Sequence, residues 1–120
     1  RTKKKFLHEV EGYKILENES CVPNVLYTDY ENNILGVEYC GETLFEKFIM
    51  KERWEFKPEI RALVSDIETK YGIYHNDMAW KNMCMLDDKL YIIDWEKWDY
   101  INRERDQHFI LMDRENKPKK

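Results

Sequence analysis

Three polar residues in the second half of the chain stand at a spacing that suits phosphoryl transfer. The carboxylate of Asp77 is followed five residues later by the amide of Asn82, and a second carboxylate, Asp94, ends the apolar run 90–93. In phosphoryl transfer from a nucleotide–metal complex, one carboxylate orients the attacking hydroxyl, and an amide and a second carboxylate bind magnesium. Asp77 is therefore the candidate base, and Asn82 and Asp94 are candidate magnesium ligands, because magnesium prefers hard oxygen donors.

The same residues have a simpler interpretation as ordinary turn residues. Aspartate and asparagine favour turns whatever the function of a protein, so an Asp-x4-Asn spacing alone indicates little. The context adds weight to the functional interpretation. His75 stands two residues before Asp77, Gly72 separates a predicted helix from this loop, and an apolar strand leads directly to Asp94.

The element that must position this loop is a long helix immediately before it. The apolar residues of segment 58–71 recur at helical spacing and form one stripe. They are Ile60, Leu63, Val64, Ile67 and Tyr71. Pro58 suits the first turn of a helix, and Gly72 is a natural stop. After the loop, segments 83–86 and 90–94 are predicted to form two short strands around a turn at 87–89.

The first half of the chain contributes a helix and a hairpin. Apolar residues at helical spacing predict a helix from about 3 to 17. Segments 24–30 and 34–39 are predicted strands of a hairpin, with a turn at 31–33.

Three more segments complete the expected order of elements. Segment 43–49 is predicted to be helical, and segment 51–57 is predicted to be a polar linker. Segment 104–112 is predicted to be a last helix, followed by a polar tail.

Composition limits the class of protein. The chain has 120 residues, 42% hydrophobic and 37% charged, which suits one globular domain. A net charge of −4 gives no electrostatic case for binding nucleic acid or an anionic membrane. No apolar run approaches the roughly 20 residues that span a bilayer. The chain begins with Arg1 rather than methionine, which suggests a truncated or processed chain.

The cysteines indicate a reducing environment. Cys21, Cys40 and Cys84 are odd in number and far apart in the sequence, so neither a disulfide framework nor a Cys-x2-Cys zinc site is expected. We interpret them as reduced thiols in or near the core of an intracellular, cytoplasmic protein.

The segment from 73 to 96 resembles the catalytic loop and metal-binding segment of the protein-kinase-like superfamily. His75-Asn76-Asp77 resembles the family's His-x-Asp triplet, and Asp77 and Asn82 keep its Asp-x4-Asn spacing. Asp94 stands where the family has the aspartate of Asp-Phe-Gly. The following Trp95-Glu96 resembles the atypical and small-molecule kinases, such as aminoglycoside and choline phosphotransferases.

The resemblance implies an α+β fold in a reduced form, with a small antiparallel N-terminal sheet and a mainly helical C-terminal part. Residues 1–120 would be a single kinase-like domain. Within it, residues 1–40 would be a remnant of the N-terminal lobe, 41–112 a short C-terminal lobe, and 113–120 a tail.

The resemblance also implies ATP and magnesium as cofactors and assigns roles to further residues. Glu38, Tyr39 and Cys40 would belong to the hinge whose backbone binds adenine. Glu9 would match the glutamate that pairs with the ATP-binding lysine, with Glu11 as the rival. Lys81, one residue before Asn82, would face the transferred phosphate, although a solvated lysine is an equal alternative. His75 would shape the loop through backbone contacts.

Two parts of the family pattern are absent from the sequence. There is no Gly-x-Gly-x-x-Gly, and no strand before the first helix carries the ATP-binding lysine. Only 26 residues follow Asp94, too few for the large C-terminal helical subdomain of the family.

The function predicted from the sequence and the resemblance is transfer of the γ-phosphate of ATP to a hydroxyl acceptor, with a small molecule favoured and a protein acceptor left open. The chain lacks these parts of the family pattern, so we expect a protein partner or a missing N-terminal segment. The alternative is an inactive pseudokinase module within a larger assembly. Its sign would be a nucleotide cleft filled by the chain's own side chains, such as Trp95 or Met83.

Overall fold

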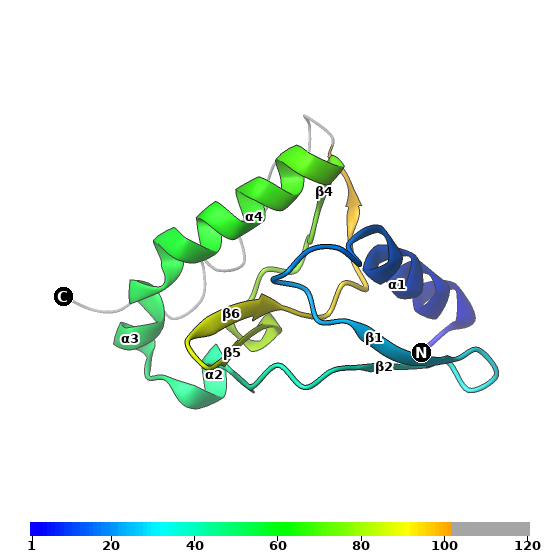
Figure 1. The fold of residues 1–120 in the computed structure, drawn as a ribbon, viewed down its shortest axis with the longest axis horizontal. Helices are drawn as coiled ribbons and strands as arrows, with labels where there is room; N and C mark the ends of the chain where they lie inside the picture. Colours follow the sequence, from blue (N-terminus) through cyan, green and yellow to red (C-terminus); the bar gives the residue numbers. More distant parts are fainter. Residues whose placement is uncertain (102–120) are drawn as a thin grey trace.

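The computed structural model describes residues 1–101, in which helices and small antiparallel sheets alternate. Helix α1 and the β1–β2 hairpin lie on one side of the molecule, and helices α3 and α4 lie on the other (Figure 1). Strands β5 and β6 lie between them. The expected mixture of helices and small antiparallel sheets is confirmed, and it is consistent with a reduced kinase-like fold.

Helix α1 (Lys3–Ile15) forms where the apolar spacing predicted it and ends two residues earlier. The Thr2 side chain caps its first turn by accepting a hydrogen bond from the Lys5 N–H at 3.2 Å. The buried face of the helix is formed by Phe6, Glu9, Gly12 and Tyr13. A glutamate on this face is unusual, because a buried charge needs a partner.

Strands β1 (Val25–Asp29) and β2 (Ile34–Val37) form the expected antiparallel hairpin. The Asp29 carboxylate accepts hydrogen bonds from the backbone N–H groups of Glu31 and Asn32, which fixes the turn. Strand β2 ends two residues before the predicted limit at 39. The Glu38 N–H still donates to the Asn24 carbonyl, and the chain then continues as irregular backbone toward strand β3.

Helix α4 (Lys57–Tyr71) confirms the predicted long helix. Pro58 lies in its first turn, and Gly72 caps its end with a left-handed φ of 68°. Its buried side chains are Ile60, Val64 and Ile67, three members of the predicted stripe.

Two shorter helices precede α4. Helix α2 (Leu44–Lys47) is a single turn closed by a capping box between Thr43 and Glu46. Helix α3 (Met50–Glu55) occupies the segment predicted to be a polar linker, so that prediction was wrong. The Glu52 carboxylate accepts a hydrogen bond from the Ile49 N–H at 3.1 Å and starts the helix. Arg53 is buried and donates to the Phe45 carbonyl, so a polar residue supplies the inner face.

Two small sheets hold the second half together. Strands β5 (Met83–Leu86) and β6 (Lys89–Ile92) form the predicted hairpin. Strand β3 (Glu42–Thr43) pairs with β5, and strand β4 (Ile73–Tyr74) pairs with β7 (Asp99–Tyr100). The three two-residue strands were not predicted. The β4–β7 pair closes the segment that contains the candidate catalytic loop.

The core lies where α4 meets the catalytic loop and the β5–β6 hairpin. Its largest fully buried side chains include Trp80, Trp95, Ile60, Met78 and Met83. The predicted helix 104–112 and the tail lie outside the described residues. Within residues 1–101, no helix has the length and apolar character needed to cross a membrane.

Candidate active site

The loop between β4 and β5 is fastened to the segment that follows β6 and carries Asp94. His75 is buried, and its Nε2–H donates to the Ile93 carbonyl oxygen at 2.8 Å. Its Nδ1 accepts a hydrogen bond from the Asp77 N–H at 3.1 Å. These two bonds assign the neutral tautomer with the proton on Nε2, and burial lowers the pKa of His75. This is the backbone bracing that the resemblance implied for His75.

Asn82 makes a second connection between the same segments. Its backbone carbonyl accepts a hydrogen bond from the Ile93 N–H at 3.0 Å. Its side-chain Nδ2 donates to the Asp77 carbonyl oxygen at 2.8 Å and lies 3.3 Å from Asp77 Oδ2. The amide nitrogen is therefore committed to the loop, which leaves Oδ1 as the group that can bind a cation.

Asp94 follows this connection immediately and has an unusual backbone conformation. Its φ is 61°, in the left-handed region, where aspartate and asparagine are the best tolerated residues after glycine. Its N–H donates to the Tyr13 hydroxyl oxygen of α1 at 3.3 Å. Burial raises the pKa of Tyr13, so the hydroxyl stays protonated. Tyr13 thus links the first helix to the carboxylate-bearing segment.

A lysine approaches Asp77, although it is not the predicted one. Lys97 Nζ lies 3.7 Å from Asp77 Oδ2, and the Asp77 side chain is only 14% exposed. Lys81, which the resemblance placed at the phosphate, is exposed on the short 3-10 turn Trp80–Asn82. Lys97 was missed because it lies 20 positions from Asp77 in the sequence.

The predicted nucleotide residues gather around one cleft of about 420 Å³. Its lining includes Glu9, Glu38, Tyr39, Cys40 and Asp94. Two larger hollows flank α1, and neither is lined by a candidate catalytic or metal-binding residue.

The side chains that would have filled the cleft in an inactive module lie elsewhere. Trp95 is 1% exposed, packs edge-on against His75, and donates its indole N–H to the Ile92 carbonyl at 3.0 Å. Met83 is fully buried in the core. Neither residue lines the cleft.

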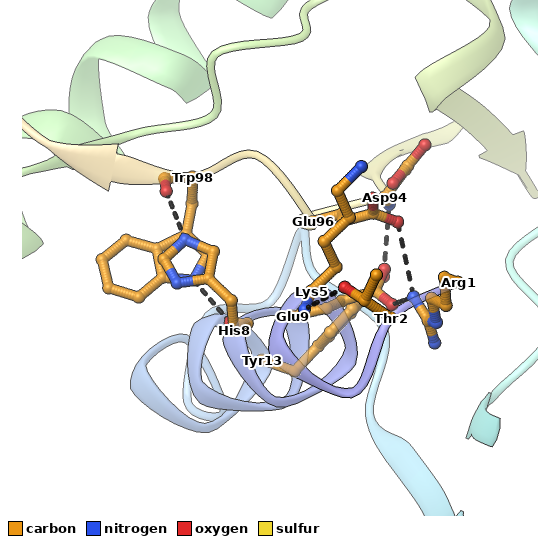
Figure 2. Close-up of polar contacts among 9 residues, drawn as sticks. All are labelled: Arg1, Thr2, Lys5, His8, Glu9, Tyr13, Asp94, Glu96 and Trp98. Carbon is orange, nitrogen blue, oxygen red and sulfur yellow. Dashed lines mark hydrogen bonds and ion pairs between the residues drawn. The ribbon is translucent and has the colours of Figure 1, made fainter. Parts of the chain in front are cut away.

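Glu9 is the buried carboxylate of the cleft, and its cation is Arg1. Figure 2 shows the Arg1 guanidinium reaching both Glu9 and Glu96. The Arg1–Glu96 distance is 3.5 Å. Burial raises the pKa of Glu9, although the neighbouring guanidinium opposes this shift. The rival Glu11 is exposed and lines a different hollow.

A second connection joins α1 to the chain after Asp94. The His8 and Trp98 rings stack with centroids 4.4 Å apart and an interplanar angle of 4°. His8 Nε2 lies 2.6 Å from the Trp98 carbonyl oxygen, and the Trp98 indole N–H donates to the His8 carbonyl at 2.7 Å (Figure 2). Sequence reasoning missed this pair because 90 residues separate its members.

The oxygen atoms of Asn82 and Asp94 are of the hard type that magnesium prefers. In residues 1–101, no group of three or more histidine, cysteine, aspartate or glutamate side chains could hold a metal ion. Magnesium is usually bound through one or two protein oxygens together with water and substrate phosphates. Asn82 Oδ1 and the Asp94 carboxylate are two oxygens of suitable chemistry, and the Ile93–Asn82 hydrogen bond connects the segments that carry them.

Comparison with known proteins gives one relative that bears on this geometry. No protein-family model matches the chain. The KEOPS complex subunit Bud32 of Pyrococcus abyssi (strain GE5 / Orsay) is 35% identical over 78 residues. Those residues are 62% of this chain and 35% of Bud32, so the chain spans little more than a third of that relative. The match supports the protein-kinase-like resemblance and does not support the small-molecule kinase type.

Proposed function

We propose that this chain is a kinase-like domain that binds a nucleotide in the cleft beside Asp94 and supports phosphoryl transfer to a hydroxyl. The observation that carries the proposal is the linkage of Asp77, Asn82 and Asp94. His75 donates a hydrogen bond to the Ile93 carbonyl, and the Ile93 N–H donates one to the Asn82 carbonyl. These two bonds hold the catalytic loop against the segment that ends in Asp94. Such fixed positions are what phosphoryl transfer requires of a protein.

In this proposal Asp77 is the base. Its carboxylate is 14% exposed and is held by the Asn82 amide and by Lys97, so it can accept a hydrogen bond from an incoming hydroxyl. Lys97 would compensate negative charge beside Asp77. Lys81 remains a second candidate for the phosphate-facing cation.

The nucleotide base would lie against residues 38–40. The Glu38 N–H already donates to the Asn24 carbonyl at 2.9 Å, and the Glu38 carboxylate accepts from the Asn24 N–H. The backbone groups of Tyr39 and Cys40 are therefore the proposed adenine partners. When bound, magnesium would neutralise phosphate charge, with Asn82 and Asp94 as its protein ligands.

The sequence lacks the lysine that binds the ATP phosphates in the resembled family. Among the described residues, Arg1 is the cation that best suits this role. Its guanidinium pairs with Glu9 on the buried face of α1. Glu9 is the residue that the resemblance matched to the glutamate that pairs with the ATP-binding lysine. An arginine can bind phosphate bidentately. The proposal therefore assigns Arg1 to the nucleotide phosphates.

The first test is calorimetric titration of ATP with and without magnesium, on the wild type and on Asp94→Asn. Asparagine tolerates the left-handed backbone at this position, so the variant keeps its local structure. We expect the magnesium-dependent part of the affinity to fall by more than about tenfold. Asp88→Asn is the matched control, because Asp88 is exposed and also left-handed, with φ 63°.

Equal nucleotide affinity in Asp94→Asn and the wild type would contradict the assignment of Asp94. If the wild type binds ATP, an acceptor screen would follow, with small hydroxyl compounds and protein hydroxyls compared at equal concentration. The Trp95-Glu96 sequence after Asp94 favours a small molecule. Asp77→Ala should then abolish transfer while leaving ATP binding within about twofold.

The second candidate function is a non-catalytic module of a larger assembly. It is favoured by the exposed apolar residues of the two-stranded hairpin. The similar protein Bud32 is named as a subunit of a complex, so we propose a protein partner for this chain as well. Absence of binding at millimolar nucleotide would favour this function.

A further inference from the structure

A buried arginine at the corner between α2 and α3 lacks a counter-ion among the described residues. Arg53 is 6% exposed, and its Nη1 donates to the Phe45 carbonyl oxygen at 3.3 Å. Within residues 1–101 its Nε–H has no hydrogen-bond partner, and no carboxylate pairs with its guanidinium. A buried charge without a partner costs free energy, and a bound anion would offset that cost.

Two glutamates of this corner are committed to helix ends. The Glu46 carboxylate accepts hydrogen bonds from the Thr43 N–H and hydroxyl, which closes the capping box of α2. The Glu52 carboxylate accepts from the Ile49 N–H at the start of α3. Both acids therefore stabilise helix ends rather than Arg53, and the charge of Arg53 is left for an anion from outside this corner.

Two exposed apolar side chains flank the arginine. Phe45 is 55% exposed and Ile49 is 68% exposed. Both residues contact Arg53, because the Ile49 carbonyl accepts from the Arg53 N–H at 3.0 Å and the guanidinium carbon lies 5.0 Å from the centroid of the Phe45 ring. Helices α2 and α3 lie at the end of the molecule opposite the β1–β2 turn, so this surface is separate from the exposed hairpin (Figure 1).

We propose that Phe45, Ile49 and Arg53 form a docking surface for a partner protein that presents a glutamate side chain between apolar residues. The glutamate carboxylate would pair with the Arg53 guanidinium, and the apolar neighbours would cover Phe45 and Ile49. Arginine is among the residues that most often carry the binding energy of protein interfaces, and apolar contacts around it exclude water. Charge complementarity identifies the occupant as acidic and apolar.

The Phe45 ring controls access to Arg53. It lies over the guanidinium in the free chain, where it shields the charge from water. An exposed aromatic side chain changes rotamer quickly, so the ring can turn aside and admit a carboxylate. The guanidinium then offers its Nε–H and an Nη–H side by side, the fork that binds a carboxylate through two hydrogen bonds.

This surface specifies the protein partner of the second candidate function and rests on that candidate. It is separate from the nucleotide cleft, because none of its three residues lines that cleft. A chain that binds ATP but no acidic peptide would count against the docking surface alone. A chain that binds the peptide but no ATP would count against the nucleotide site alone.

The test is a peptide titration of the whole isotope-labelled chain, followed by NMR. The probe is acetyl-Leu-Glu-Leu-amide, and acetyl-Leu-Gln-Leu-amide is the control of nearly equal shape without the charge. The Arg53 Nε–H resonance, identified by its loss from the spectrum of Arg53→Lys, reports on the guanidinium directly. We expect the glutamate peptide to shift this resonance and to bind at least about tenfold more tightly than the glutamine peptide.

Three variants separate the role of Arg53 from that of general charge. Arg53→Met keeps the length of the side chain and should reduce the preference for the glutamate peptide to less than about twofold. Lys51→Met is the matched control, because it removes the same charge from an exposed position of the same helix, and it should keep the wild-type preference. Ile49→Ser retains a good N-cap for α3 and should weaken both peptides by about threefold or more.

Three results would overturn the inference. The first is equal affinity of the wild type for the two peptides, or no binding of either at about 10 mM. The second is sodium acetate that shifts the Arg53 resonance at the same concentrations as the glutamate peptide, which would mean an anion site without a protein surface. The third is a shift of that resonance with protein concentration alone, which would make a second copy of the chain the occupant. The comparison of the two peptides on the wild type requires no variant, so it decides the matter even if a substitution at Arg53 prevents folding.

Discussion

At the scale of single residues, the site depends on a buried histidine that must stay neutral. His75 donates to the Ile93 carbonyl and accepts from the Asp77 N–H, so protonation of Nδ1 would break the second bond. Burial already lowers the pKa of His75 below its ordinary value of 6.5. The histidine therefore couples the stability of the loop to pH.

The direction of this pH dependence follows from comparing proton binding by His75 in the folded and the unfolded chain. Below the ordinary pKa of 6.5 the unfolded chain binds a proton at His75 that the folded chain excludes. The free energy of unfolding should therefore fall as pH drops below that value, by up to about 1.4 kcal/mol per pH unit. Glutamine can donate and accept in the same place. In denaturant titrations between about pH 6.5 and 5.5, the free energy of unfolding should therefore fall less for His75→Gln than for the wild type.

The difference between His75→Gln and the wild type removes the contributions of the other titrating groups. Parallel loss of stability in the two proteins would mean that His75 is not the group responsible.

The two lysines near the catalytic loop allow a direct comparison. If the proposed transfer is observed, Lys97→Met should lower kcat by about tenfold or more, because its ammonium lies 3.7 Å from Asp77. Lys81→Met is the matched control, because it makes the same substitution at the other lysine, and it should change kcat by less than about threefold. The reverse order of effects would restore the role that the resemblance gave to Lys81.

Residue types and spacing identified the carboxylates and the amide but not their partners. Asp77, Asn82 and Asp94 were found because the catalytic loop is local in sequence. Arg1 and Lys97 were not, since nothing in an isolated lysine or arginine indicates which carboxylate it will meet. The roles of all these residues stay predictions until binding or transfer is measured.

At the scale of elements, α1 is held to the segment after Asp94 by the His8–Trp98 pair. Gly12 lies beneath this contact, and a Cβ there would be 2.6 Å from Trp98 Cδ1. The Trp98 ring is buried, stacked and hydrogen-bonded, so it cannot move aside cheaply. Close packing at this glycine therefore sets the distance between the helix and the site.

A double-mutant cycle tests this packing. In an open helix Gly→Ala is stabilising by about 1 kcal/mol, but Gly12→Ala should be destabilising by about 1–3 kcal/mol because of overpacking. In a Trp98→Leu background the clash is absent, and the same substitution should become neutral or stabilising. Chemical denaturation of the four proteins measures the coupling. A stabilising Gly12→Ala in the wild-type background would show that the helix is free to shift.

The longer elements were predictable, and the shortest were not. Helix α4 and the β5–β6 hairpin have clear apolar periodicity with a glycine or a turn at their ends. Strands β3, β4 and β7 have two residues each, too few to show any alternation. Helix α3 was mistaken for a linker because a buried arginine, Arg53, occupies a position where the pattern requires an apolar residue.

At the scale of the whole molecule, the β1–β2 hairpin exposes apolar side chains. Leu26 is 67% exposed and Tyr27 58%, and Val25, Tyr30 and Ile34 are exposed beside them. The sheet has two strands, so both of its edges lack a neighbouring strand within the described residues. Unpaired edges with apolar side chains favour association with another chain.

Association can be tested with one pair of variants. The protein alone should self-associate with rising concentration in analytical ultracentrifugation, and Leu26→Lys should reduce this association. Ile49→Lys is the matched control, because Ile49 is 68% exposed but lies at the start of α3, away from the hairpin. Equal effects of the two substitutions would mean that added charge, rather than the hairpin, determines solubility.

The short β4–β7 pair has a mechanical consequence. Ile73 pairs with Tyr100, and the Ile101 N–H donates to the Gly72 carbonyl at 2.9 Å, so the chain enters and leaves the catalytic segment at one point. A force applied to the chain beyond residue 101 would load this junction and helix α4 before it reached Asp94. The β4–β7 pair therefore stands between a tether attached at that end and the catalytic segment.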